Sequence, residues 1–115
     1  MIAANAALNK QAEDVTILDV RALSTVTDFF IIASAATTRQ IAAIAEEIDR
    51  ELTRRGGDVL HVEGLKERVA AASGLSWVLI DCGDLVVHVF NPPAREFYQL
   101  ERLWADAPRL AVEPA

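Results

Sequence analysis

The aspartates Asp81 and Asp84 form the best candidate carboxylate pair in the sequence. Two carboxylates can hold a divalent ion for phosphoryl transfer. Such sites usually place both groups on one face of a strand, two residues apart, whereas these two lie three positions apart across a glycine. We therefore interpret both as turn residues that accept hydrogen bonds from local backbone amides. A second interpretation is an acidic hairpin tip that faces a basic partner.

Histidine and cysteine offer two further kinds of chemistry. A zinc site needs three or four His, Cys or carboxylate ligands. His88 with Cys82 and Asp81 is conceivable, but the spacing does not demand it. We interpret His61 and His88, both in predicted strands, as packed structural histidines. Cys82 has no obvious base partner in the sequence, which disfavours a nucleophilic role. We therefore expect no metal and no cofactor.

A phosphate-binding turn is also disfavoured. The segment 35–38 joins a predicted strand to a predicted helix, and it contains neither G-x-G-x-x-G nor a P-loop lysine. Ser24 and Ser34 lack the elbow motif of a nucleophilic serine. The sequence therefore predicts a protein that is not an enzyme.

The aromatic residues of the segment 77–104 indicate a binding surface instead. Trp77, Tyr98 and Trp104 are three of only seven aromatic residues in the chain, and all three fall in this segment. Tryptophan and tyrosine, with arginine, dominate the hot spots of protein interfaces. We expect Phe90 and Phe97 to pack the last helix onto the sheet. For Trp77 and Trp104, a binding role and a core role both remain open.

The composition fits one soluble domain that binds protein rather than nucleic acid. A chain of 115 residues can bury a core without metals or disulfides. Its net charge is −6 and its basic residues are scattered, whereas a protein that grips nucleic acid needs a basic face. An acidic domain is better suited to a basic protein partner. We found no membrane span, no signal peptide and a single cysteine, which together favour a cytoplasmic protein.

The hydrophobic pattern predicts an α/β or α+β domain. Several predicted strands are apolar on both faces, as in a sheet covered by helices on at least one side. The expected strands are 15–20, 28–34, 58–62, 77–82 and 85–90, and the expected helices are 2–12, 38–55 and 92–103. We expect one domain over residues 1–106, with a mobile excursion at 65–76 and a loosely ordered tail at 107–115.

Local signals define the ends of these elements. Thr37 and Gln40 have the form of a capping box at the start of the long helix, and Gly56-Gly57 terminates it. The last two strands form a hairpin through Gly83-Asp84. Asn91 and Pro92 supply the N-cap and the first position of the final helix. On the long helix we expect an apolar stripe and the ion pairs Glu46–Arg50 and Glu51–Arg55.

Five blocks in fixed order resemble the ribosomal silencing factor (Iojap-like) family over residues 12–106. The blocks are ILDVRALSTVTDFFIIAS (17–34), TTRQIAAIAEEI (37–48), VEG (62–64), WVLIDCGDLVVHVF (77–90) and REFYQLERLW (95–104). The resemblance implies an α/β (α+β) fold with a single mixed sheet of about five strands flanked by helices, similar to the nucleotidyltransferase fold but without established catalytic function.

The resemblance also implies a function. Family members bind ribosomal protein fourteen of the large subunit at the subunit interface, sterically block joining to the small subunit and so repress translation. A role in large-subunit maturation is also attributed to the family, and some members resemble homodimers. One alternative is a metal-dependent nucleotidyltransferase-like enzyme that uses Asp81 and Asp84, although such enzymes pair a Gly-Ser turn with D-x-D and this chain has neither. Another alternative is a large-subunit assembly factor.

By resemblance, seven residues are expected to face the partner. Apolar anchors would come from Trp77, Leu103 and Trp104, and basic side chains of the partner would meet the carboxylates. The full set is Trp77, Asp81, Asp84, Tyr98, Glu101, Leu103 and Trp104. The chain departs from the family pattern in a longer segment before Trp77, a short N-terminal helix and Ala35-Ala36 in place of a glycine and polar residues.

Overall fold

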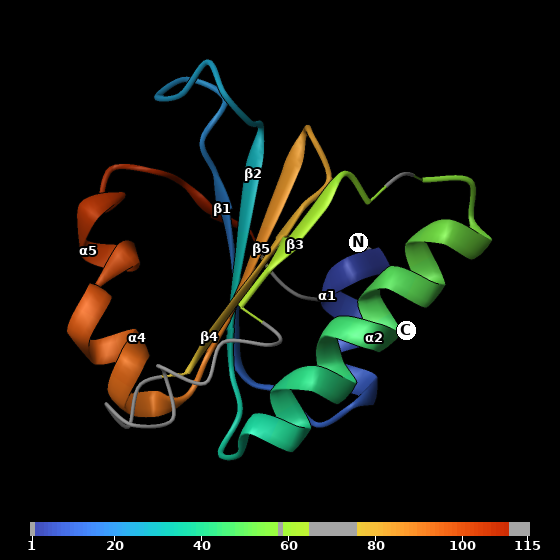
Figure 1. Cartoon of the computed structure of the whole chain (residues 1–115). Helices are drawn as coiled ribbons and strands as arrows, with labels where there is room; N and C mark the ends of the chain where they lie inside the picture. Colours follow the sequence, from blue (N-terminus) through green and yellow to red (C-terminus); the bar gives the residue numbers. More distant parts are fainter. Residues whose placement is uncertain (1, 58, 65–75, 111–115) are drawn as a thin grey trace.

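The computed structural model describes residues 2–57, 59–64 and 76–110, which form one six-stranded mixed sheet between two layers of helices (Figure 1). The predicted α/β class is confirmed. The elements in chain order are α1 (Ile2–Asn9), β1 (Glu13–Asp19), β2 (Phe29–Ser34), α2 (Thr38–Arg54), β3 (His61–Glu63), β4 (Trp77–Asp81), β5 (Leu85–Phe90), α4 (Pro92–Tyr98), α5 (Leu100–Leu103) and β6 (Arg109–Leu110).

The strands lie in the order β3-β4-β5-β2-β1-β6. The central neighbours β2 and β5 are parallel, with Ile31 opposite Val87, and the other described pairs are antiparallel. The predicted hairpin of β4 and β5 is confirmed. Its turn contains Gly83 at φ 84°, a left-handed conformation that glycine adopts without steric cost.

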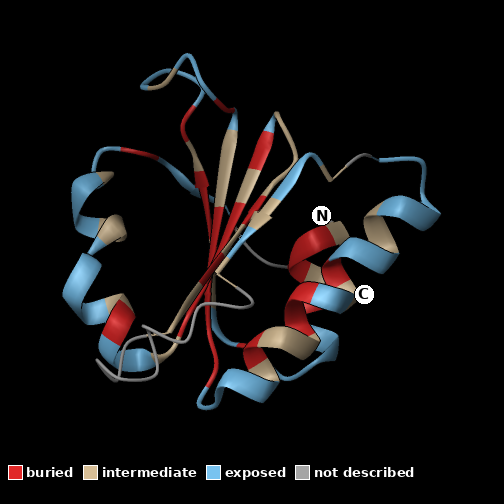
Figure 2. Ribbon diagram, in the orientation of Figure 1, coloured by how far each residue is buried: buried red, intermediate tan, exposed pale blue. Residues whose placement is uncertain are grey.

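Each face of the sheet has its own core, because successive side chains of a strand point to opposite faces. Helices α1 and α2 cover one face and bury Ile17, Ile31, Ala33, Val78, Ile80, Val87 and Val89. Helices α4 and α5 lie over the other face, whose smaller core contains Leu18, Val20, Ile32, Phe90, Ala94 and Ala107. Figure 2 shows the buried residues concentrated along the middle of the sheet and the inner side of α1 and α2.

Helix α2 forms as its sequence predicts. The Thr37 hydroxyl accepts a hydrogen bond from the Gln40 N–H at 3.1 Å. The Gln40 side chain differs from a standard capping box, because it accepts from the Ala36 N–H at 3.2 Å. The expected Glu51–Arg55 pair is present at 3.9 Å, whereas Arg50 pairs with Glu47 rather than with Glu46. The buried stripe consists of Ile41, Ile44, Ala45 and Ile48.

The C-terminal region differs from the sequence expectation in two ways. The single helix expected over 92–103 is two helices, because Gln99 between them adopts φ 48°. A sixth strand, Arg109–Leu110, lies in the segment 107–115 for which we expected loose order, and it pairs with Leu18 and Ile17 of β1. Two residues are too few to show a strand period, so this pairing had no sequence signal. Residues 111–115 lie outside the described residues.

Several smaller boundaries also moved. Helix α1 ends at Asn9 rather than at residue 12, β1 covers Glu13–Asp19 rather than 15–20, and β3 covers His61–Glu63 rather than 58–62. The predicted excursion at 65–76 falls, except for Ser76, outside the described residues. None of the helices in the described ranges is both long enough and apolar enough to cross a bilayer.

His88 is the histidine that the smaller core encloses. Its side chain belongs to β5, is 6% exposed and points away from the face that buries Val87 and Val89, as predicted. The rings of Phe30, Trp77 and Phe90 surround it, with centroids at 5.4, 5.8 and 6.0 Å. Burial lowers the pKa of His88 from its ordinary value of 6.5 to about 4. The imidazole is therefore neutral in the folded protein at neutral pH.

This depressed pKa predicts that acid destabilises the protein through His88. The unfolded chain takes up a proton at His88 as the pH falls through 6.5, whereas the folded chain resists protonation until about pH 4. The free energy of unfolding therefore falls by on the order of 3 kcal/mol as the pH falls from 6.5 to about 4. Urea unfolding at several pH values should show that the free energy of unfolding depends less steeply on pH in His88→Asn than in the wild type.

The exposed His61 supplies the control for this prediction. Its imidazole Nε2 lies 2.8 Å from Glu63 Oε1 on edge strand β3, where both side chains are well exposed. His61→Asn should keep most of the wild-type pH dependence between pH 7 and 4.5. If the free energy of unfolding depends equally steeply on pH in the wild type and in His88→Asn, the effect does not come from His88.

Candidate functional site

The sheet face beneath α4 and α5 carries rows of side chains that cross several strands. The register aligns these rows, because residues opposite each other in neighbouring strands point to the same face. The first row is Trp77, Phe90 and Ser34; the second is Glu63, Leu79, His88, Ile32 and Thr16; the third is His61, Asp81, Val86, Phe30 and Leu18.

Helices α4 and α5 cover these rows unevenly. The rows are buried at Leu18, Ile32, His88 and Phe90. Toward the β3 edge the side chains are half-buried or exposed. We define the open face as Glu63, Trp77, Leu79, Asp81 and Val86. A pocket of about 100 Å³ lies where β4 begins, between Glu63, Gly64, Trp77 and Leu79. The sequence carried a signal for Leu79 and Val86, because alternation places them on the same face as Trp77.

Trp77 belongs both to the open face and to the smaller core. Its indole N–H donates to His88 Nδ1 at 3.1 Å, which fixes the direction of the ring. The ring also stacks on Phe90 at 5.7 Å and lies 5.1 Å from Tyr98. Phe30 continues the contacts from His88 to Trp104, at 5.4 and 5.3 Å. Both tryptophans are half-buried members of one aromatic cluster.

Helices α4 and α5 add exposed apolar side chains next to this cluster. Leu103 is 73% exposed and Tyr98 is 43% exposed. Phe97 is 69% exposed and contacts the Tyr98 ring edge-on at 5.2 Å. The expectation that Phe97 packs against the sheet is therefore wrong, whereas Phe90 is buried as expected. A seven-residue helix can bury one narrow side, and Ala94 occupies that side of α4.

Asp81 and Asp84 lie at the other end of the hairpin, four or more residues from Trp77. Four residues of strand span about 13 Å. Asp81 Oδ1 accepts the Gly83 N–H at 2.9 Å, which confirms its interpretation as a turn residue. Asp84 is exposed, and its carbonyl oxygen accepts from the amides of Asp28 and Phe29 at 3.0 and 3.2 Å. The acidic tip is therefore held against the loop that precedes β2.

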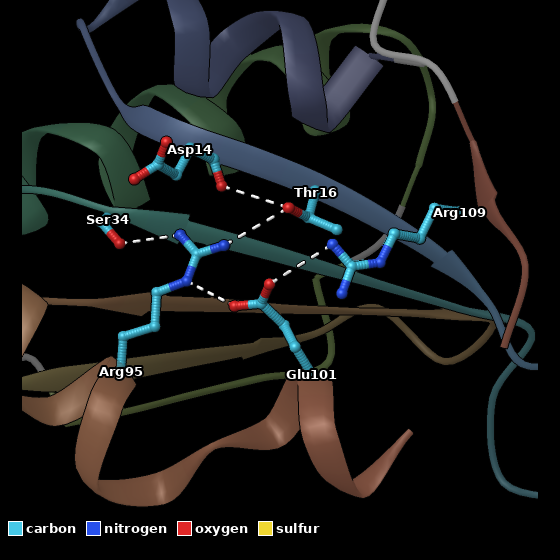
Figure 3. Close-up of polar contacts among 6 residues, drawn as sticks. All are labelled: Asp14, Thr16, Ser34, Arg95, Glu101 and Arg109. Atoms are coloured by element: carbon cyan, nitrogen blue, oxygen red, sulfur yellow. Dashed lines mark hydrogen bonds and ion pairs between the residues drawn. The ribbon is translucent and has the colours of Figure 1, made fainter. Parts of the chain in front are cut away.

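Glu101 occupies a different environment from the other expected carboxylates. Its Oε1 accepts from Arg95 Nε at 2.6 Å, and its Oε2 lies 3.8 Å from Arg109 Nη1 (Figure 3). Arg95 also donates to the hydroxyls of Ser34 at 2.8 Å and Thr16 at 3.3 Å. Glu101 is thus engaged within the protein: it joins α5 to Arg95 of α4 and lies near Arg109 of β6, while Arg95 reaches β1 and β2.

No pattern in the sequence indicates this arginine network. Arg95 and Glu101 are six residues apart, which is not a contact spacing on a continuous helix. The network borders an open cleft of about 480 Å³ between the start of β1 and the two short helices. The cleft is lined by Glu13, Asp14, Ser34, Pro92, Arg95, Glu96, Gln99, Glu101 and Arg102.

The groups considered for catalysis have the following environments. Burial, followed by the charges of Asp81, Asp84 and Asp49, raises the pKa of Cys82 to about 11, so this thiol is protonated at neutral pH. Among residues 2–57, 59–64 and 76–110, no three His, Cys, Asp or Glu side chains are placed to hold a metal ion together. His88 is a packed histidine as predicted, whereas His61 is exposed.

Comparison with known proteins places the whole chain in one family. The family model described as "Ribosomal silencing factor during starvation" matches residues 1–115. The ribosomal silencing factor of Bacillus subtilis is 43% identical over 107 residues, which cover 93% of this chain and 85% of that protein. The ribosomal silencing factor of Halalkalibacterium halodurans is 38% identical over 112 residues, with coverages of 97% and 90%.

A solved structure supports the same assignment. The X-ray crystal structure of a protein from Chromobacterium violaceum superposes with a TM-score of 0.81 at 34% sequence identity, and the match covers 99% of this chain and 90% of that one. The fold, the order of the sequence blocks and the match along the whole chain agree. The chain therefore belongs to the ribosomal silencing factor family.

Proposed function

We propose that this protein represses translation by binding the large ribosomal subunit and blocking its joining to the small subunit. The partner would be ribosomal protein fourteen of the large subunit, and the binding surface would combine the open face, the hairpin tip at Asp84 and the exposed residues of α4 and α5. The protein would act in the cytoplasm, without catalysis.

One observation carries this proposal: apolar side chains remain uncovered beside the aromatic cluster. Leu103 and Tyr98 are exposed, while Trp77, Leu79 and Val86 are half-buried. Interface hot spots are typically aromatic residues that neighbouring contacts hold rigidly. The stacking on Phe90 and the hydrogen bond to His88 supply such rigidity to Trp77. Little conformational entropy would then be lost when a partner covers this surface.

Charge favours a basic partner for the same surface. The protein has a net charge of −6. Asp84 is exposed at the hairpin tip, and Glu63 is exposed at the edge of the open face. Acidic groups around an apolar patch would accelerate encounter with a basic protein and would repel the phosphates of RNA. We therefore assign the main contact to ribosomal protein rather than to ribosomal RNA.

Co-sedimentation with separated ribosomal subunits tests the proposal directly. The purified protein should be retained on large subunits and not on small ones. Pre-incubation with large subunits should then reduce the yield of joined ribosomes in a gradient. Retention without an effect on joining would mean that the protein binds large subunits but does not act as a steric block. No retention on either subunit would overturn the proposal.

Leu103 and Trp104 are expected to respond differently to truncation. Leu103→Ala should weaken binding to large subunits by about 1 kcal/mol, roughly fivefold, without changing thermal stability, because the side chain is 73% exposed. Trp104→Ala should weaken binding by about 2 kcal/mol and also lower the melting temperature, because its ring packs on Phe30. Affinity is measured by titration on purified subunits and stability by thermal unfolding.

Leu8 offers a matched control for these truncations. It is an aliphatic residue, 37% exposed, on α1, which covers the opposite face of the sheet. Leu8→Ala should therefore leave affinity unchanged. If Trp104→Ala lowers stability but leaves affinity intact, Trp104 is a core residue and not an anchor.

Charge reversal at Asp84 is expected to act on the association rate. Asp84→Lys should slow association with large subunits, and the effect should shrink as salt rises, because the carboxylate is exposed and screened. Glu46→Lys makes the same charge change on an exposed position of α2, over the opposite sheet face, and should have a smaller effect. Stopped-flow measurements at two salt concentrations compare the variants. Equal rates for both variants would remove Asp84 from the binding surface.

A further inference from the structure

The break between α4 and α5 is a feature that the local sequence does not favour. Gln99 has φ 48° and ψ 47°, in the left-handed region that non-glycine residues rarely occupy. Its neighbours include good helix formers such as Leu100, Glu101 and Arg102. A continuous helix would satisfy these local preferences, so contacts elsewhere in the protein must hold the break.

Arg95 makes the polar contacts among them. Its side chain is 15% exposed and binds Glu101 of α5 at 2.6 Å, Ser34 of β2 at 2.8 Å and Thr16 of β1 at 3.3 Å. Figure 3 shows the guanidinium lying between the sheet and the Glu101 carboxylate, which itself reaches toward Arg109 of β6. Arg95 thereby ties both short helices to the sheet.

The Arg95–Glu101 pair is specific to the broken form. In a continuous α-helix, residues six positions apart are rotated by about 120° from each other and displaced by about 9 Å along the axis. Their side chains would then point to different sides of the helix, and this ion pair would be lost. The pair therefore favours the bend over a straight helix.

The bend determines how the exposed apolar side chains are presented. Tyr98 ends α4 immediately before Gln99, while Leu103 and Trp104 end α5 after it. A straight helix would rotate Leu103 and Trp104 relative to Tyr98 and would move Trp104 away from Phe30, whose ring lies 5.3 Å from it. The relative placement of these side chains thus depends on the conformation of Gln99.

We propose that Arg95 is a positioning residue for the partner-binding surface: through its ion pair with Glu101 it holds the bend at Gln99 and so presents Tyr98, Leu103 and Trp104 together. This inference rests on the proposed function. Arg95 acts through the helices and does not itself touch the partner.

Backbone preference at residue 99 allows a rescue experiment. Arg95→Met keeps an unbranched apolar side chain but removes the ion pair, and it should weaken binding to purified bacterial large ribosomal subunits by about tenfold. Adding Gln99→Gly, which favours the left-handed conformation, should restore most of the affinity. Adding Gln99→Ala, which removes the same side chain but disfavours that conformation, should restore none. Co-sedimentation titrations measure all three variants beside the wild type.

NMR contacts provide a readout that is independent of the ribosome. A continuous helix gives Hα–Hβ contacts between residues i and i+3 that run through residue 99, whereas the bend interrupts them. These contacts should appear in Arg95→Met and in its Gln99→Ala double variant, and should disappear in the Gln99→Gly double variant. Should Arg95→Met fail to fold, Glu101→Gln replaces it, because this change keeps the residue's shape and weakens the same pair.

The outcomes separate the possible errors. Wild-type affinity in Arg95→Met, or equal affinities of the two double variants, would overturn the positioning role, since direct contact with the partner could not be rescued by a glycine at position 99. If the wild type itself does not bind large subunits, the proposed function fails, and the partner-binding part of this inference fails with it. The NMR contacts would still decide whether Arg95 holds the bend.

Discussion

The parallel pairing of β2 with β5 places two strands from distant parts of the chain side by side in the middle of the sheet. Ile31 and Ile32 of β2 face opposite cores, and both are fully buried. Because parallel strands end at the same edge, α2 and α4 both start from that edge, after Ser34 and Phe90 respectively. The two helices then diverge to opposite faces (Figure 1). Among the described residues, α1 and α2 cover most of one face, whereas α4 and α5 cover only part of the other.

The partial cover of the second face follows from the size of its helices. Helix α2 has 17 residues and, with α1, buries one side of the sheet, whereas α4 and α5 have seven and four. Two short helices can cover β1 and β2 but leave the side chains of β4 and β3 half-buried or exposed. The aromatic cluster lies where the covered part of this face meets the open part, because one edge of a large ring can pack in the core while the other edge remains at the surface. A surface that is apolar yet rigid results.

Polar contacts stabilise the boundary between core and surface. The hydrogen bond from Trp77 to neutral His88 satisfies an indole N–H that stacking alone would leave unpaired. The Arg95 network satisfies the hydroxyls of Ser34 and Thr16 beneath α4. His88 and Ser34 are buried and their partners are partly buried, so losing either interaction would leave a costly unsatisfied polar atom. The geometry of the partner-facing side chains therefore depends on residues that do not face the partner.

The sequence alone determined the elements that local patterns encode. The stripe and cap of α2, the alternation in β4 and β5, the glycine turn between them and the Asn91-Pro92 helix start were predictable because each depends on residues a few positions apart. The ordered blocks also predicted the family. The seven expected partner-facing residues remain predictions, and the structure places them at separate points: Asp81 and Asp84 at the hairpin tip, the aromatic residues near α4, and Glu101 within a network.

Tertiary structure decided the rest. The bend at Gln99, the sixth strand at Arg109–Leu110, the pairing of Glu101 with Arg95 and the exposure of Phe97 had no local signal. At Gln99 the local preference for a helix was overridden, because the break allows Glu101 to pair with Arg95, which also binds Ser34 and Thr16 of the sheet. Interactions between residues far apart in the chain form only once the sheet has brought them together. They therefore leave no periodic pattern in the sequence from which they could be predicted.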